Sequence, residues 1–206
     1  MSTMLSHSKK FIFFHNYKVA GSSISNVLSK YEPHYWIRTA LRKAGVKKYY
    51  PALANFEQHA SALDVRDLVD GNTFKTYYKF TFVRNPWDWQ VSLFHYMRQS
   101  KRHFQHDLIK NMTFEEYIDW RVNHDLKLQC NRFVDEQGNI LVDFVGQFEN
   151  LERDFAKVCE SLSIEMRLPH KNRSKHGSYR DYYNERTCQL VKDAFAKDIA
   201  LFDYEF

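Results

Sequence analysis

Two apolar runs, each followed by a cation and then by a predicted helix start, constrain the fold of this chain more than any other feature. The first run covers residues 11–15 and precedes Lys18 and Gly21, and the second covers residues 77–83 and precedes Arg84. Compact apolar runs of this length are typical of buried β-strands. Because these strands alternate with predicted helices, the pattern indicates an α/β fold in which helices flank a central, mainly parallel sheet.

The helices are predicted from apolar periodicity and from the residues at their ends. Gly21 opens the first helix, in which Ile24, Val27 and Leu28 form an apolar stripe. Pro86 suits the first turn of the helix after the second strand, where a missing N–H costs nothing. Thr113 and Glu116 have the spacing of a capping box. Helices after the first are expected over about residues 61–69, 86–102, 113–122, 151–162 and 184–200.

Three further expectations concern the remaining segments. Residues 132–134 and 140–145 resemble the strands of a short hairpin around the turn at residues 135–139. Residues 70–72 are expected to stop a helix, and the polar residues 1–9 are expected to form a flexible N-terminus. Because no repeat, low-complexity tract or linker interrupts the sequence, we predict a single domain over residues 1–206.

Composition and charge narrow the classes of function. Aromatic residues make up 17% of the 206 residues, which excludes disorder over most of the chain. The formal net charge of +5 suits an anionic ligand but is too small to predict a nucleic-acid partner. Cys130, Cys159 and Cys188 are widely spaced and odd in number, so reduced, buried thiols are expected. With no signal peptide or membrane-spanning run, the sequence predicts a cytoplasmic protein.

The turn after the first strand has the features of an anion-binding site. Exposed N–H groups at a helix start, together with the helix dipole, favour an anion there. Lys18 adds a full charge, and Gly21 allows the backbone to approach a ligand closely. Ser22 and Ser23 add hydroxyl donors. Taken alone, this segment could equally be an ordinary capped helix after a strand.

The turn after the second strand suggests a second anion site. Arg84 stands at the carboxyl end of its strand, where ligands of open α/β sheets bind. Ser92 lies about two helical turns after Pro86, so its hydroxyl and the Arg84 guanidinium could reach one phosphate. An arginine–carboxylate pair with a capping serine is the alternative explanation for this segment.

Taken together, the two turns resemble the PAPS-dependent sulfotransferases, particularly the carbohydrate sulfotransferase branch (PAPS is 3′-phosphoadenosine 5′-phosphosulfate). The 5′-phosphosulfate loop of that family has the form Pro-Lys-x-Ala-Gly-Thr-Ser, and residues 17–23 read Tyr-Lys-Val-Ala-Gly-Ser-Ser. Its 3′-phosphate motif has the form Val-Arg-Asn-Pro-x-Asp-Arg-x-x-Ser, and residues 83–92 read Val-Arg-Asn-Pro-Trp-Asp-Trp-Gln-Val-Ser. Residues 144–151 and 172–183 also resemble segments of the family, so the likeness spans nearly the whole chain in the same order.

The resemblance implies a P-loop-NTPase-like sulfotransferase fold in a soluble, bacterial-type member of the family. It implies in-line transfer of a sulfuryl group from PAPS to an acceptor hydroxyl, on a carbohydrate or glycoconjugate, with adenosine 3′,5′-bisphosphate as product. No carboxylate cluster has metal spacing, so no metal is expected. The residues expected to bind the donor are Lys18, Ala20, Gly21, Ser22, Ser23, Arg84, Ser92, Arg173 and Ser174.

The implied chemistry also needs a base and a means of attracting the acceptor. His59 is the candidate base because an imidazole titrates near neutrality, and the glycan 2-O-type members of the family carry a histidine in a similar place. Glu57 is the alternative base, and His59 could instead cap the next helix. Arg98 and Arg102 could attract an anionic glycan, or could only complement the C-terminus of their helix.

Two other classes of function stay open on the sequence. A nucleotide or small-molecule kinase would need a loop in which a lysine follows the glycines, whereas Lys18 precedes Gly21. A non-catalytic protein that binds polyanions or glycans would suit the basic charge. The combination of Lys18, Arg84, Ser92 and a candidate base favours an enzyme over such a binder.

Overall fold

The computed structural model describes residues 3–32, 60–168 and 177–206, and the chain divides into two compact units. Met1–Val83 and Asn131–Lys171 form the sheet unit, and Arg84–Cys130 and Asn172–Phe206 form the helical unit. Each unit is described by itself. The expectation of one domain over residues 1–206 stays a prediction.

The sheet unit is built on four strands in the order β1-β2-β3-β4. β1 pairs with β2 in antiparallel fashion, whereas β2 with β3 and β3 with β4 are parallel pairs. This mainly parallel sheet with flanking helices confirms the predicted fold class. The strands are β1 (Met4–Ser6), β2 (Phe11–Phe14), β3 (Tyr78–Val83) and β4 (Phe144–Gln147). The helices are α1 (Gly21–Leu28), α3 (Ala62–Leu68), α4 (Gly71–Thr76) and α8 (Leu151–Ser161), with 3-10 turns η1 (Ser29–Tyr31) and η3 (Phe148–Asn150).

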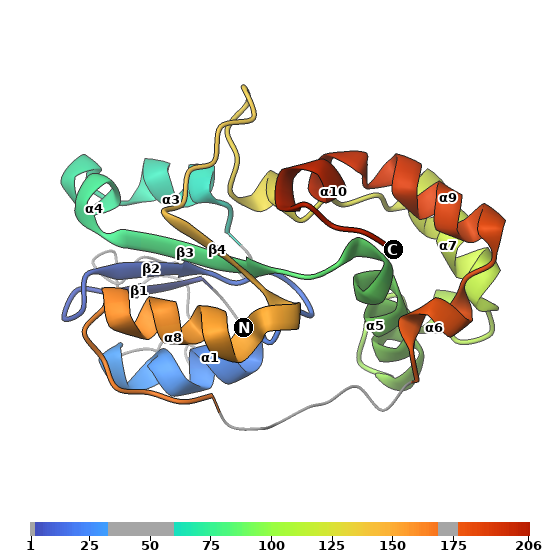
Figure 1. Cartoon of the computed structure of the whole chain (residues 1–206), viewed down its shortest axis with the longest axis horizontal. Coiled ribbons are helices and arrows are strands. Elements are labelled where there is room, and N and C mark those ends of the chain that lie inside the picture. Colours follow the sequence, from blue (N-terminus) through green and yellow to red (C-terminus); the bar gives the residue numbers. More distant parts are fainter. Residues whose placement is uncertain (1–2, 33–59, 169–176) are drawn as a thin grey trace. The chain divides into compact units, whose positions relative to one another are not determined.

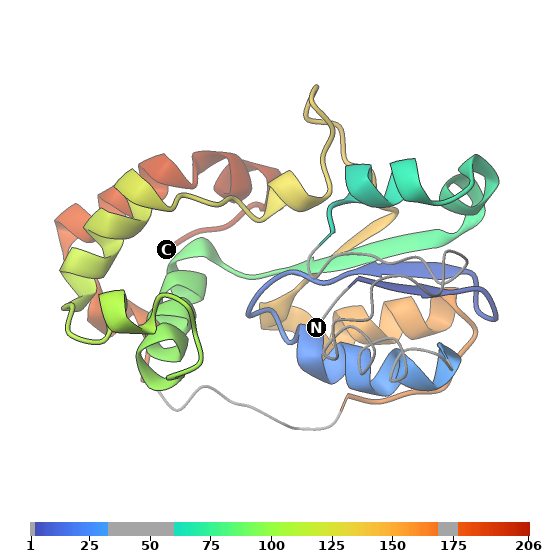
Figure 2. The ribbon, with the colours of Figure 1, turned by 180° about the vertical axis from the view of Figure 1, so that it is seen from behind.

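Helices cover both faces of this sheet, which explains the apolar runs in its central strands. α1 and α8 lie on one face, and α3 and α4 lie on the other (Figure 1 and Figure 2). A strand covered on both faces carries apolar side chains at successive positions instead of alternate ones. All of β2 is buried, and Phe13 stacks on Phe80 of β3 with ring centroids 5.1 Å apart. The predicted stripe of α1 is also buried in this core, at Ile24, Val27 and Leu28.

The helical unit consists of helices and turns. It contains α5 (Pro86–Gln99), α6 (His106–Ile109), α7 (Phe114–His124), α9 (Glu185–Ala194) and α10 (Ala196–Phe202), with the 3-10 turn η4 (Tyr179–Tyr182). A further 3-10 turn, η2 (Cys130–Arg132), lies where the chain returns to the sheet unit. α5 begins at Pro86 as predicted, and the side chain of Asn85 caps it by accepting a hydrogen bond from the Trp87 N–H at 3.0 Å.

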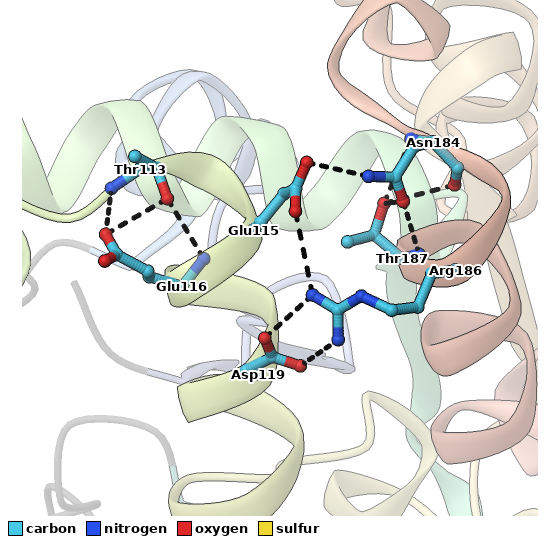
Figure 3. Close-up of polar contacts among 7 residues, drawn as sticks. All are labelled: Thr113, Glu115, Glu116, Asp119, Asn184, Arg186 and Thr187. Atoms are coloured by element: carbon cyan, nitrogen blue, oxygen red, sulfur yellow. Dashed lines mark hydrogen bonds and ion pairs between the residues drawn. The ribbon is translucent and has the colours of Figure 1, made fainter.

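A polar network joins α7 to α9 within the helical unit (Figure 3). Arg186 donates to both carboxylate oxygens of Asp119, at 2.7 and 2.9 Å, and Nδ2 of Asn184 donates to Glu115 at 2.7 Å. The hydrogen bonds from Arg186 lower the pKa of Asp119. Because these side chains are exposed, we expect the network to orient the two helices and to add little to the free energy of unfolding.

Several segments of the sheet unit differ from the sequence-based expectation. Met4–Ser6 was expected to be flexible, but it forms β1 and is buried against β2. Asp70 was expected to help stop a helix, but its side chain caps α4 by accepting from the Thr73 N–H at 2.9 Å. The predicted hairpin is reduced to an isolated bridge between Val134 and Ile140, because Phe144–Gln147 pairs with β3.

In the helical unit, the predicted helices are confirmed, some of their ends differ, and α6 was not predicted. The capping box of Thr113 and Glu116 is present at the start of α7. The helix predicted over residues 184–200 is divided into α9 and α10 at Phe195, which leaves the helical conformation (φ −105°, ψ 19°) while its ring is buried. Among the helices of the described residues, none is both long enough and apolar enough to cross a membrane.

Candidate functional site

The loop between β2 and α1 has an unusual backbone. Lys18 and Ala20 both adopt the left-handed conformation, with φ angles of 61° and 60°. Residues that carry a Cβ rarely adopt it, so surrounding contacts must hold the loop in this shape. Loops that alternate left-handed residues with others can direct successive N–H groups toward one concave anion site.

Buried neighbours hold this loop against the sheet unit. Val19, between the two left-handed residues, is fully buried. Nδ2 of Asn16 donates to the carbonyl of Phe82 at 3.2 Å, and the Asn16 side chain is itself buried. The loop is therefore fixed to the end of β3 by a packed side chain and by a buried hydrogen bond.

Gly21 is required by the close approach of a histidine ring. A Cβ built on Gly21 would lie 2.0 Å from Cδ2 and 2.2 Å from Nε2 of His15. His15 is only 5% exposed, so its ring has little room to move away. The sequence suggested that Gly21 makes room for a ligand, whereas the structure gives it a packing role as well.

We expect Gly21→Ala to destabilise the protein by about 1–3 kcal/mol, as overpacking usually does. The loss should exceed the small gain in helix propensity that alanine brings. Urea unfolding of the variant and of the wild type measures the difference. In a His15→Ala background the same substitution should cost much less, because the ring that it meets is gone. Equal costs in the two backgrounds would contradict the packing role.

The start of α1 supplies the donors of this loop. Ala20 is the N-cap residue, and its side chain has no polar atom with which to cap the helix. The N–H groups of Ser23 and Ile24 donate to the carbonyl of Ala20, at 2.9 and 3.2 Å. Gly21 and Ser22 therefore present the leading N–H groups of α1 at the positive end of the helix dipole. Lys18, two residues before Ala20, adds a cation to this loop, so the arrangement can bind an anionic group.

The helical unit begins with Arg84, the predicted second cation. Its side chain is 4% exposed, and its Nε donates to Oδ2 of Asp88 at 2.7 Å. This ion pair is part of the alternative that the sequence left open, although the cap of α5 is Asn85 and not a serine. A paired and buried guanidinium has a fixed orientation, which bidentate binding of a phosphate also requires.

The backbone of Arg84 is clamped by residues distant in sequence. Gln129 accepts from the Arg84 N–H at 2.9 Å and donates to the Arg84 carbonyl at 2.7 Å. Asp198 in turn accepts from the N–H groups of Gln129 and Cys130, at 2.8 and 2.9 Å. Burial raises the pKa of Asp198 and raises that of the Cys130 thiol to about 12, so this thiol is protonated at neutral pH. The clamp fixes where α5 begins.

Ser92 lies on the same face of α5 as Asp88, because the two residues are four positions apart within the helix. Arg84 precedes the helix and is linked to this face by its ion pair with Asp88. Ser92 is buried, and one turn further along Nε2 of His95 shares a 2.8 Å hydrogen bond with the hydroxyl of Tyr182 in η4. η4 (Tyr179–Tyr182), which is part of the family-like segment at residues 172–183, therefore packs on α5.

The structure brings the predicted donor-binding residues into two groups. Those of the sheet unit form one continuous loop and helix start: Lys18, Ala20, Gly21, Ser22 and Ser23. Arg84 and Ser92 lie together in the helical unit. That the two groups hold two ends of one ligand stays a prediction.

The other predicted site residues have different outcomes. His59, Glu57, Arg173 and Ser174 lie outside the described residues. Arg98 and Arg102 are exposed, in the last turn of α5 and just beyond it.

Sequence reasoning missed three residues that support Arg84. Asp88 could have been found, because an arginine and a carboxylate four residues apart often pair at a helix start. Gln129 and Asp198 left no local signal, since they reach Arg84 only through contacts formed by folding.

A sequence model described as "Sulfotransferase family" matches residues 1–205, which include both turns. An uncharacterized protein of Archaeoglobus fulgidus (strain ATCC 49558 / DSM 4304 / JCM 9628 / NBRC 100126 / VC-16) is 32% identical over 102 residues. The aligned part covers 48% of this chain and 79% of the archaeal protein.

Proposed function

We propose that this chain, which belongs to the sulfotransferase family, transfers a sulfuryl group from PAPS to an acceptor hydroxyl. Membership of the family establishes sulfuryl transfer in general terms. The observation that carries the choice of PAPS is the loop before α1, where Lys18 precedes a helix start whose N-cap residue, Ala20, has no capping side chain. The sequence of this loop resembles that of the 5′-phosphosulfate loop of the family.

In the proposed reaction, the acceptor oxygen attacks sulfur from the side opposite the 5′-phosphate. The new oxygen–sulfur bond forms as the bond from sulfur to the bridging oxygen breaks, and that oxygen leaves with the electron pair. Lys18 and the N–H groups of Gly21 and Ser22 stabilise the charge that develops on the departing phosphate. As in phosphoryl transfer, positioning and charge stabilisation supply most of the catalysis.

The 3′-phosphate would be held by the second group of residues. Arg84 contributes a guanidinium oriented by Asp88, and Ser92 contributes a hydroxyl one turn after Asp88 in α5. Arg173 and Ser174 are proposed to close over this phosphate. A second anion site of this kind would distinguish PAPS from nucleotides that lack a 3′-phosphate.

We propose His59 as the base that accepts the acceptor proton, with Glu57 as the alternative. His59→Ala should leave the affinity for adenosine 3′,5′-bisphosphate unchanged and lower turnover by about 10²-fold, the lower end for general base catalysis. Steady-state rates and nucleotide titrations of the variant measure the two effects. Glu57→Gln is the matched variant, and full activity in His59→Ala would transfer the role to another group.

The proposed acceptor is a carbohydrate or glycoconjugate, as in the branch of the family that the chain resembles. Arg98 and Arg102 are exposed cations that could attract an anionic acceptor of this kind. Screening hydroxyl-bearing acceptors with labelled PAPS tests this assignment.

Calorimetric titration with adenosine 3′,5′-bisphosphate, without magnesium, tests the donor. We expect micromolar affinity, because both anion sites bind a phosphate of this product. Adenosine 5′-monophosphate is the matched control, and it should bind more weakly because it lacks the 3′-phosphate. Absence of binding at millimolar bisphosphate would rule out the proposal.

A further inference from the structure

The segment that follows α5 exposes large apolar side chains in an unusual concentration. Phe104 is 81% exposed and Leu108 is 49% exposed, and Tyr96 lies nearby in the sequence at 36%. Single exposed apolar residues are ordinary, but an aromatic ring that stands almost wholly in solvent is costly unless something covers it. We call residues 100–110, together with Tyr96 of α5, the docking segment.

Contacts with its surroundings fix the docking segment in place. Nδ1 of His106 shares a 3.0 Å hydrogen bond with the Met97 carbonyl, and Nε2 of Gln105 donates to Asp125 at 3.1 Å. These bonds tie the segment to α5 and to the turn after α7. These hydrogen bonds therefore fix the segment that carries Phe104 in a position that leaves the ring exposed.

The exposed ring of Phe104 belongs to an aromatic ladder. The ring of His103 stacks on Phe104 with centroids 4.8 Å apart and meets Tyr96 edge-on at 5.5 Å. Burial lowers the pKa of His103, which favours the neutral imidazole at neutral pH. The ladder thus presents aromatic surface without a charge of its own.

The charge around this ladder is positive. Arg98, Lys101 and Arg102 are exposed, and none of them makes an ion pair with another residue in the described part of the chain. The nearby carboxylates are compensated, since Asp107 pairs with Lys110 at 2.7 Å and Asp125 pairs with Lys127 at 2.7 Å. The docking segment therefore combines protruding apolar groups with uncompensated cations.

We propose that the docking segment attaches the protein to an anionic lipid surface. Aromatic and aliphatic groups that enter the interface, beside cations that meet anionic headgroups, are the combination by which peripheral proteins bind membranes. A fluid bilayer accommodates a protruding ring without a preformed pocket, whereas a glycan would use the cations and leave Phe104 and Leu108 unburied. The net charge of +5 adds a long-range attraction to the same surface.

Co-sedimentation with vesicles tests this proposal. The intact protein should bind vesicles of equal parts phosphatidylcholine and phosphatidylglycerol, and bind phosphatidylcholine vesicles far more weakly. Phe104→Ser/Leu108→Ser should weaken partition by about 10-fold or more, because it removes the apolar anchors. Lys101→Glu/Arg102→Glu should weaken it by about 10²-fold at low salt. Leu68→Ser, which changes a 63% exposed leucine of α3, is the matched control and should bind like the wild type.

Thermal unfolding of each variant separates loss of docking from loss of fold, since these exposed substitutions should leave the Tm unchanged. Three results would overturn the proposal. The first is no binding to either vesicle. The second is binding that the apolar variant leaves intact and that heparin abolishes, which would indicate a polyanion site. The third is a dimer that Phe104→Ser/Leu108→Ser dissociates, with no vesicle binding, which would make the segment an interface between copies of the chain.

Discussion

Replacing Lys18 with methionine is expected to lower turnover by about 10²–10³-fold, the usual cost of losing one group that stabilises charge in a transition state. The affinity for adenosine 3′,5′-bisphosphate should fall much less. In the donor, the bridging oxygen carries its full negative charge only as its bond to sulfur breaks, so the interaction with Lys18 grows along the reaction. Methionine keeps an unbranched side chain and removes the charge. Steady-state kinetics and calorimetric titration of the same preparation give the two quantities.

The control for Lys18→Met is Lys30→Met in the same unit. Lys30 is exposed and lies over the ring of Tyr31, 4.8 Å from its centroid, so its loss should change neither rate nor affinity. Because Lys18 has a left-handed backbone, the unfolding midpoint of Lys18→Met must also be measured. If turnover and bisphosphate affinity fell by the same factor at unchanged stability, Lys18 would be a ground-state binding residue.

The sheet and its first helix could be predicted because their signals are local. Phe11–Phe14 and Tyr78–Val83 are short apolar strands covered on both faces, and such strands are recognisable from composition alone. The start of α5 could also be predicted, because Pro86 follows Asn85, a residue type that can cap a helix. β1 was missed because it is short and is preceded and followed by polar residues, and its burial depends on pairing with β2.

The shape of the candidate site was harder to predict than its composition. Gly21 and Lys18 were proposed from sequence, but nothing in the sequence marked Lys18 and Ala20 for the left-handed backbone that they adopt and that glycine ordinarily supplies. The reason is tertiary: buried Val19 and the bond from Asn16 to the end of β3 hold the loop. Such contacts join positions far apart in the chain, so no local pattern reveals them.

The contacts that hold Arg84 in place also could be predicted only in part, because some of them come from residues distant in the sequence. Its ion pair with Asp88 follows from helical spacing, and a sequence argument could have included it. Its backbone clamp depends on Gln129 and, through that residue, on Asp198 in α10. A buried polar group must find a partner when the chain folds, but its sequence does not say which one. Residues that position a site are therefore harder to predict than residues that contact its ligand.

Arg84→Ala should weaken binding of adenosine 3′,5′-bisphosphate by about 10²–10⁴-fold, because two hydrogen bonds to a charged phosphate are lost at about 1.5–3 kcal/mol each. The affinity for adenosine 5′-monophosphate should be nearly unchanged, since that ligand has no 3′-phosphate. The ratio of the two affinities is thus a direct measure of the role proposed for Arg84. Calorimetric titration with both ligands provides it.

Loss of the Arg84 guanidinium also leaves the carboxylate of Asp88, which is 16% exposed, without its ion pair. Arg84→Ala/Asp88→Ala removes this unpaired charge and should show the same selective loss of bisphosphate affinity. Arg186→Ala breaks another arginine–aspartate pair in the same unit, far along the chain from the candidate site, and should leave both affinities unchanged. If Arg84→Ala weakened the binding of both nucleotides equally, Arg84 would stabilise the start of α5 and would not contact the 3′-phosphate. A selective loss that survives in the double variant can come only from the missing guanidinium, because the stray carboxylate is then absent.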